Sequence, residues 1–177
     1  MSQRGAIIGV ADHGGWAIFV TVSGDGKLLD RRRVDLVDED LPKIPHHSEA
    51  QGLPLKEAVA LVERVRASAE QHARRRLEEV DVALPGQIAG IAVRGCPDLP
   101  PTIAECITDY RAQNNADWVM YRRALAKAAE ARGWAVNWYD AKSVDDAAFA
   151  KIGKAIGPPW NKDHRVAMAA AIAALQA

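Results

Sequence analysis

The chain has 177 residues, of which 49% are hydrophobic and 26% are charged, as is usual for a soluble globular protein. Basic and acidic residues number 23 each, and the formal net charge of +0 excludes nucleic-acid binding by bulk positive charge. No apolar run approaches the roughly 20 residues of a membrane helix, and two cysteines cannot build a disulfide framework. We therefore expect a single domain over residues 1–177, cytoplasmic and without a membrane partner.

The N-terminal part predicts three antiparallel strands. Residues 6–22 are apolar but are interrupted by Asp12, His13 and two glycines, as in two strands joined by a turn. Residues 23–26, Ser-Gly-Asp-Gly, indicate a second turn, because Asp-Gly tolerates the positive φ angles of tight hairpins. Residues 28–37 then supply a third strand, so the chain opens with an antiparallel meander.

A long amphipathic helix is predicted next. The polar loop 38–54 ends in Pro54, which suits the first turn of a helix. Apolar residues follow at three- and four-residue spacing, as one helix face requires. They are Leu55, Val59, Val62, Val65, Ala69, Ala73, Leu77 and Val80. His72 lies near this face and is predicted to be packed.

The remainder alternates strands with helices. The expected elements, in order, are a strand at 87–93, a helix at 102–132, a strand at 134–139 and helices at 145–156 and 163–176. The first of these helices is expected to break near Asn114 and Asn115. Strands separated by helical crossovers must pair in parallel. The prediction is an α/β fold with a mixed five-stranded sheet and helices on its faces.

Three segments carry a family resemblance. Residues 7–15, Ile-Ile-Gly-Val-Ala-Asp-His-Gly-Gly, are similar to an apolar-Gly-apolar-Asp-x-Gly strand opening. Residues 139–144 are similar to a Tyr-x-Pro-x-x-Val segment, and residues 163–169 to a helix with the pattern Asp-x-x-Asp-Ala-x-Ala. With the element order, these resemble the ribonuclease H-like superfamily, most closely Holliday-junction resolvases of the RuvC type. The resemblance implies strand order 3-2-1-4-5.

The function that this resemblance implies is a metal-dependent nuclease. In such enzymes two Mg²⁺ or Mn²⁺ ions, held by carboxylates, stabilise the attacking and leaving oxygens of phosphodiester cleavage. Asp12 and Asp163 match the family's acidic positions on the first strand and the last helix, so the resemblance implies that they are catalytic, assisted by Asp98 and Asp140. The resemblance also makes Asp12, Asp163 and His164 the candidate metal ligands.

The sequence also departs from the family pattern. Ala11 stands where the family has its first Asp, and Asp12 follows one residue later; such a slip turns a strand side chain to the other face unless a bulge compensates. Residues 92–94 lack the Glu expected near the end of the fourth strand, and Val166 occupies the second acidic position of the last helix. Asp12 also suits a turn, and Asp163 also suits a helix cap.

Candidate nucleic-acid contacts are Arg31, Arg32, Arg33, Trp160 and Lys162. The alternative for the arginines is a solvated face, and tryptophans 118, 134, 138 and 160 are expected to pack in the core or at its edges.

Three functions remain open. They are a Mg²⁺- or Mn²⁺-dependent endonuclease, a non-catalytic nucleic-acid or protein-binding module with a degenerate metal site, and a small homo-oligomeric scaffold such as a homodimer.

Two further features of the sequence are weaker indications of a functional site. His46, His47 and Glu49 are of metal-ligand type but lack a second cluster of such residues, so a transition-metal site is only weakly indicated. Cys96 follows Arg94-Gly95 and would act as a nucleophile only if its pKa were lowered. No histidine partner for it can be named from spacing.

Overall fold

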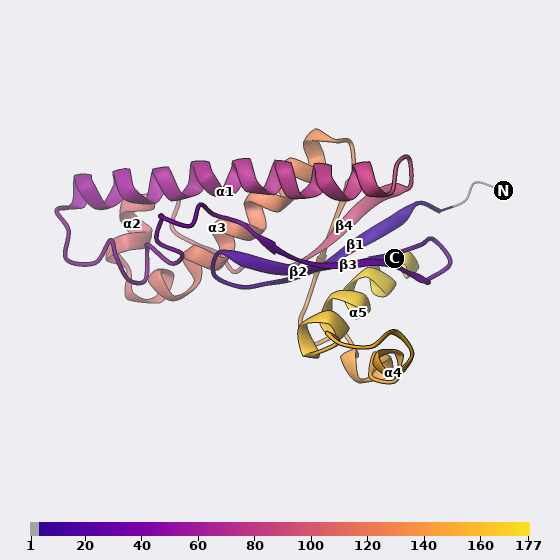
Figure 1. The fold of residues 1–177 in the computed structure, drawn as a ribbon. Helices are drawn as coiled ribbons and strands as arrows, with labels where there is room; N and C mark the ends of the chain where they lie inside the picture. Colours follow the sequence, from indigo (N-terminus) through magenta and orange to yellow (C-terminus); the bar gives the residue numbers. More distant parts are fainter. Residues whose placement is uncertain (1–3) are drawn as a thin grey trace.

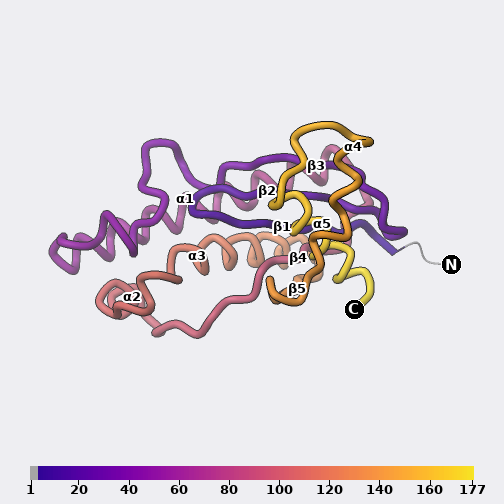
Figure 2. The backbone as a smooth tube through the Cα atoms, turned by 90° about the horizontal axis from the view of Figure 1, so that it is seen from below, coloured from indigo at the N-terminus to yellow at the C-terminus, as the bar shows by residue number. Residues whose placement is uncertain are grey.

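The strands form a single mixed sheet in the computed structural model, which describes residues 4–177 (Figure 1). They are β1 (Ala6–Asp12), β2 (Trp16–Val22), β3 (Leu28–Asp35), β4 (Ile88–Arg94) and β5 (Ala135–Tyr139). Their order is β3-β2-β1-β4-β5, with β1, β2 and β3 antiparallel and with β4 parallel to both β1 and β5 (Figure 2). The predicted meander and strand order are confirmed.

Helices cover both faces of this sheet. They are α1 (Leu55–Ala83), α2 (Ile103–Thr108), α3 (Tyr110–Ala131), α4 (Ile152–Ile156) and α5 (Lys162–Gln176), with a 3-10 turn at Asp146–Phe149. Figure 1 shows α1 and α3 on one face and α5 with α4 on the other. In both views α2 and the first turns of α1 project beyond the ends of the strands. No helix within residues 4–177 combines the length and apolarity that a membrane crossing requires.

Strand alternation separates the core into two layers. Ile8 and Val10 of β1 pack in the layer beneath α1 and α3, whereas Ile7 and Ala11 pack in the layer beneath α5. The apolar face predicted for α1 is buried from Val62 to Val80, and His72 is buried as predicted. Leu55 is exposed because α1 begins beyond the end of the sheet.

The register of β1 fixes the direction of Asp12. The β1–β2 pairing runs without interruption from Ile7 opposite Val22 to Asp12 opposite Ala17. The register shift in β1 lies at its start, between Ala6 and Ile7, where β1 pairs with β4. No bulge therefore compensates the one-residue slip, and Asp12 follows Ile8 and Val10 toward α3.

Two predicted helices differ from the structure. The helix expected over residues 102–132 breaks at Asp109, not at Asn114 and Asn115, because the Asp109 carboxylate caps α3 by accepting a hydrogen bond from the Ala112 amide (2.8 Å). The helix expected over 145–156 is a 3-10 turn followed by the short α4.

Candidate functional site

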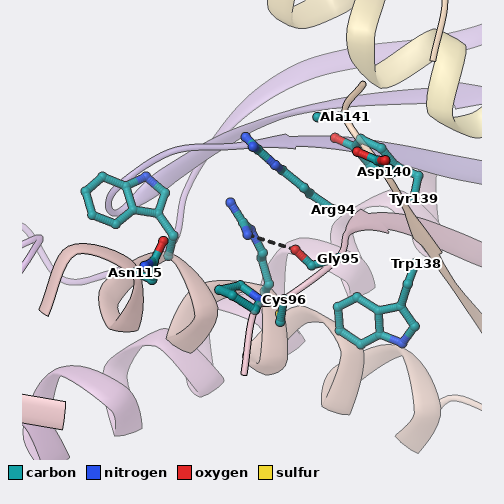
Figure 3. A pocket seen from close by; sticks show the side chains of 11 residues that line it. Arg94, Gly95, Cys96, Asn115, Trp138, Tyr139, Asp140 and Ala141 are labelled. Carbon is teal, nitrogen blue, oxygen red and sulfur yellow. Dashed lines mark hydrogen bonds between the residues drawn. The ribbon is translucent and has the colours of Figure 1, made fainter. Parts of the chain in front are cut away.

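A cleft of about 710 Å³ opens where β4 and β5 end at their carboxyl edge (Figure 3). Its walls come from the two strand ends and from α3, so residues far apart in sequence meet there. The lining residues are Arg94, Gly95, Cys96, Pro97, Asn115, Trp118, Arg122, Trp138, Tyr139, Asp140 and Ala141. Open parallel sheets characteristically bind ligands outside the carboxyl ends of their strands.

A buried ion pair ties α3 to the end of β1 beside this cleft. Arg122 Nε donates to Asp12 Oδ2 at 2.8 Å, and only 1% of the Asp12 side chain and 8% of the Arg122 side chain are exposed. Arg122 also donates through Nη1 to the Gly95 carbonyl at 3.1 Å (Figure 3). Burial raises the pKa of Asp12, and the Arg122 charge and hydrogen bond act in the opposite direction.

The cleft also presents a second guanidinium and two indoles. Arg94, the last residue of β4, is exposed and extends into the open centre of the cleft (Figure 3). It makes no ion pair or hydrogen bond through its side chain within residues 4–177. Trp138 is 49% exposed, and Trp118 is half-buried. The expectation that Trp138 packs is wrong, because its side chain lines the open cleft at the end of β5.

The remaining polar groups of the cleft are held in place. The Tyr139 hydroxyl donates to the Val10 carbonyl at 2.7 Å, and burial raises its pKa above the ordinary range. Burial also raises the pKa of Cys96, the opposite of what a nucleophilic thiol requires. Asp140 is exposed, and its Oδ1 accepts a hydrogen bond from the Lys142 amide at 2.9 Å.

Asp163 lies in the first turn of α5, the helix on the other face of the sheet. Its Oδ1 is 3.0 Å from His13 Nε2 in the β1–β2 turn. The His13 ring stacks on Trp16 with centroids 4.1 Å apart, and the Arg33 guanidinium lies 4.6 Å from the Trp16 centroid. Each carboxylate of the predicted catalytic pair thus lies beside a nitrogen-containing side chain, Arg122 for Asp12 and His13 for Asp163.

No family model matches this sequence, and no curated protein matches it. Among solved structures, one of T. thermophilus RuvC in complex with a Holliday junction substrate is similar to it, with a TM-score of 0.52 and 16% identity. The match covers 94% of this chain and 90% of that chain. The fold is ribonuclease H-like, of the RuvC type. A second structure, of Thermus thermophilus RuvC, matches with a TM-score of 0.49 and 16% identity over 94% of this chain and 91% of that chain.

The residues of this RuvC-type fold do not suit a carboxylate metal centre. Such a centre needs several hard oxygen ligands converging on one point. Within residues 4–177, no three His, Cys, Asp or Glu side chains are grouped so as to hold a metal ion. Asp12 turns toward α3, whereas Asp163 belongs to the helix on the opposite face. Arg94 ends β4, where resolvases of this type carry a Glu.

The other predicted ligands lie apart from this arrangement. Asp98 is exposed in the loop that follows β4. His164 is buried, and Asn161 and His164 form a capping box at the start of α5, with His164 Nδ1 2.9 Å from Asn161 Oδ1. The helix cap is therefore Asn161 and not Asp163. The catalytic and metal-binding roles of these residues remain predictions.

The predicted nucleic-acid contacts are mostly engaged inside the molecule. Arg31 donates to the backbone carbonyls of Ile156, Gly157 and Pro159 and so fixes the loop after α4. Arg32 and Arg33 pair with Asp30 and Asp35, each at 2.7 Å. Trp160 donates its indole N–H to the Phe149 carbonyl at 2.9 Å. Lys162 is exposed.

The cleft residues Arg94, Arg122, Trp118 and Trp138 were missed as a group by sequence reasoning. A usable signal was the position of Arg94 and Tyr139 at the ends of two strands that must be parallel neighbours. No spacing rule links either strand end to Arg122, which arrives from the middle of α3.

Proposed function

We propose that this protein is a nucleic-acid-binding module of RuvC-type fold that does not cleave through a metal centre. The observation that carries this proposal is the buried pair between Asp12 and Arg122. A carboxylate that already accepts a hydrogen bond from a guanidinium has lost much of its capacity to bind a divalent cation. The positive charge of Arg122, fixed at this point, would also repel such an ion.

The cleft chemistry supports binding of a strand with unpaired bases. Indole rings provide stacking platforms for bases, and guanidinium groups bind phosphates and stack on π-systems. Trp118 and Trp138 supply the stacking platforms. Arg94 supplies a guanidinium that forms no ion pair with a carboxylate within residues 4–177. The structurally similar RuvC is seen with a Holliday junction substrate, which makes branched DNA a rational probe beside single strands.

The proposal is tested by fluorescence anisotropy with labelled four-way junctions, duplexes and single strands, as DNA and as RNA. Binding is measured in EDTA and again with Mg²⁺ or Mn²⁺, and the samples are then run on denaturing gels. We expect binding in EDTA, no cleavage products with either metal, and a preference for substrates with unpaired bases. Trp138→Ala should weaken binding about tenfold, since one base stack contributes about 1–3 kcal/mol.

Tyr110→Ala is the matched control, because Tyr110 is an exposed aromatic on α3 that does not line the cleft. It should bind as the wild type does. Absence of binding to every probe would refute the proposal. Metal-dependent cleavage that disappears in Asp12→Asn would also refute it and would favour the endonuclease.

A further inference from the structure

A second cavity, of about 280 Å³, lies between α1, α2 and α3 and shares no lining residue with the cleft. One side of α1 contributes Val62, Arg66 and Glu70, spaced four residues apart so that they form one stripe. The facing side comes from α3, and the third wall is formed by α2 with the Leu99-Pro100-Pro101 segment before it. Its volume is slightly below the usual range of ligand pockets, about 300–1,000 Å³, so only a small ligand would fit.

The interior of this cavity is apolar. Val62, Val119 and Met120 are buried in its walls, and Leu99 and Ile103 are partly buried. Cys106 is also buried there, and burial raises the pKa of its thiol, so it behaves as a small apolar side chain. These surfaces suit the hydrocarbon part of a ligand.

One histidine in the wall is held in a fixed orientation. The fully buried Asp117 carboxylate accepts hydrogen bonds from the His46 and His47 amides, each at 3.0 Å, and its Oδ1 lies 2.8 Å from His46 Nδ1. An ionised carboxylate can only accept hydrogen bonds, so the imidazole nitrogen that faces Asp117, Nδ1, carries the proton. Nε2 is then the polar atom of His46 that remains for a ligand.

The mouth of the cavity carries excess positive charge. Lys127 is paired with Glu70 at 3.1 Å, so these two charges cancel. Arg66 and Arg123 are exposed, and neither makes an ion pair within the part of the chain that the structure describes. Two unpaired guanidinium groups above an apolar interior favour a ligand with a negative head and a hydrocarbon body.

We propose that this cavity binds a small organic carboxylate with an apolar body. Arg66 and Arg123 bind the carboxylate, since guanidinium and carboxylate groups form charge-assisted bidentate hydrogen bonds. His46 hydrogen-bonds through Nε2, and the side chains between α1 and α3 enclose the hydrocarbon part. The site is independent of the nucleic-acid-binding cleft.

The test uses two probes with the same hydrocarbon body, the anionic 3-phenylpropionate and its neutral amide, 3-phenylpropanamide. Each is titrated into the 177-residue protein at low salt, with binding followed by calorimetry and by methyl NMR shifts of Met120 and Ile103. We expect the acid to bind at least about tenfold more tightly than the amide, since hydrogen bonds to charged groups contribute about 1.5–3 kcal/mol. The methyl signals should shift with both.

Arg66→Gln and Arg123→Gln should each weaken binding of the acid about tenfold and leave binding of the amide unchanged. Arg64→Gln is the matched control, because Arg64 is an exposed arginine on the same helix that does not line the cavity. All three positions are exposed, so the variants should fold. Equal binding of acid and amide, equal loss in all three variants, or no binding of the acid would each overturn the proposal.

Discussion

At the scale of single residues, the Asp12–Arg122 pair is the most consequential contact in the molecule. Removing two charges from water is costly, and the pair offsets that cost through a direct hydrogen bond and a further bond from Arg122 to the Gly95 carbonyl. A buried pair of this kind gives little net stability by itself. Breaking one side of it, however, leaves the other charge buried without compensation.

Asp12→Asn should therefore destabilise the protein by about 3–5 kcal/mol, because Arg122 remains buried without a counter-charge. The double variant Asp12→Asn/Arg122→Met should recover most of that loss. The measurement is the free energy of unfolding in urea for the wild type, both single variants and the double variant. If Asp12 belonged instead to a cluster of metal-binding carboxylates, Asp12→Asn would raise the free energy of unfolding of the metal-free protein, because it would relieve repulsion between like charges.

Asp140→Asn provides the control for this cycle. Asp140 lines the same cleft but is exposed, and its hydrogen bond from the Lys142 amide can be kept by asparagine. Its effect should stay within about 0.5 kcal/mol. If Asp12→Asn were as harmless as Asp140→Asn, the ion pair would not have the structural role assigned to it.

At the scale of elements, the backbone of α5 packs directly against β1, the central strand of the sheet. Gly9 is in β1 on the side that faces α5, and a Cβ at this position would overlap the Ala167 carbonyl oxygen. Ala167 itself is fully buried, and the alanine-rich face of α5 permits the close approach. The glycine is therefore required by backbone-to-backbone packing rather than by its φ angle.

Gly9→Ala should cost about 3 kcal/mol or more, because the methyl group meets helix backbone that cannot rotate away. Thermal and urea unfolding measure the loss. Gly95→Ala is the comparison, since a Cβ there would meet the Tyr139 carbonyl oxygen at 3.5 Å, an ordinary contact. Similar stability for the two variants would contradict this account of the α5–β1 contact.

Most of these elements could be predicted because a long periodic pattern of apolar residues identifies a helix or strand even where single positions depart from the pattern. The α1 face runs over many turns, and each buried position from Val62 to Val80 supports the same face. The break between α2 and α3 could not be placed, because it depends on one capping contact. Asp109, Asn114 and Asn115 are all residue types that can cap a helix, and the structure uses Asp109, whose carboxylate accepts from the Ala112 amide.

At the scale of the whole molecule, the fold was predictable while the chemistry of the site was not. The strand order was implied by the family resemblance, whereas the direction of Asp12 depends on an uninterrupted register in β1. Its partner Arg122 is 110 residues away along the chain. The arginines of β3 looked available in sequence, but Arg31 holds the loop after α4 through three backbone carbonyls.

The balanced charge of the whole chain has a consequence for nucleic-acid binding. With a net charge of +0, no long-range field gathers a polyanion, and among residues 4–177 the basic side chains that line the cleft are Arg94 and Arg122. Arg122 is already neutralised by Asp12. The number of phosphates neutralised on binding should therefore be about one, far fewer than in proteins that bind through a broad basic surface.

This count predicts a shallow dependence of affinity on salt. For a single strand, the slope of log K against log salt concentration is about −0.7 per phosphate, so the wild type should give a slope of about −0.7. Arg94→Gln should reduce the magnitude of the slope by about 0.7, because it removes one phosphate contact. Trp138→Ala should lower affinity at every salt concentration and leave the slope unchanged, since stacking releases no counterions. Anisotropy titrations at several KCl concentrations measure both effects. A slope several times steeper, unaffected by Arg94→Gln, would place the nucleic acid on a different surface of the molecule.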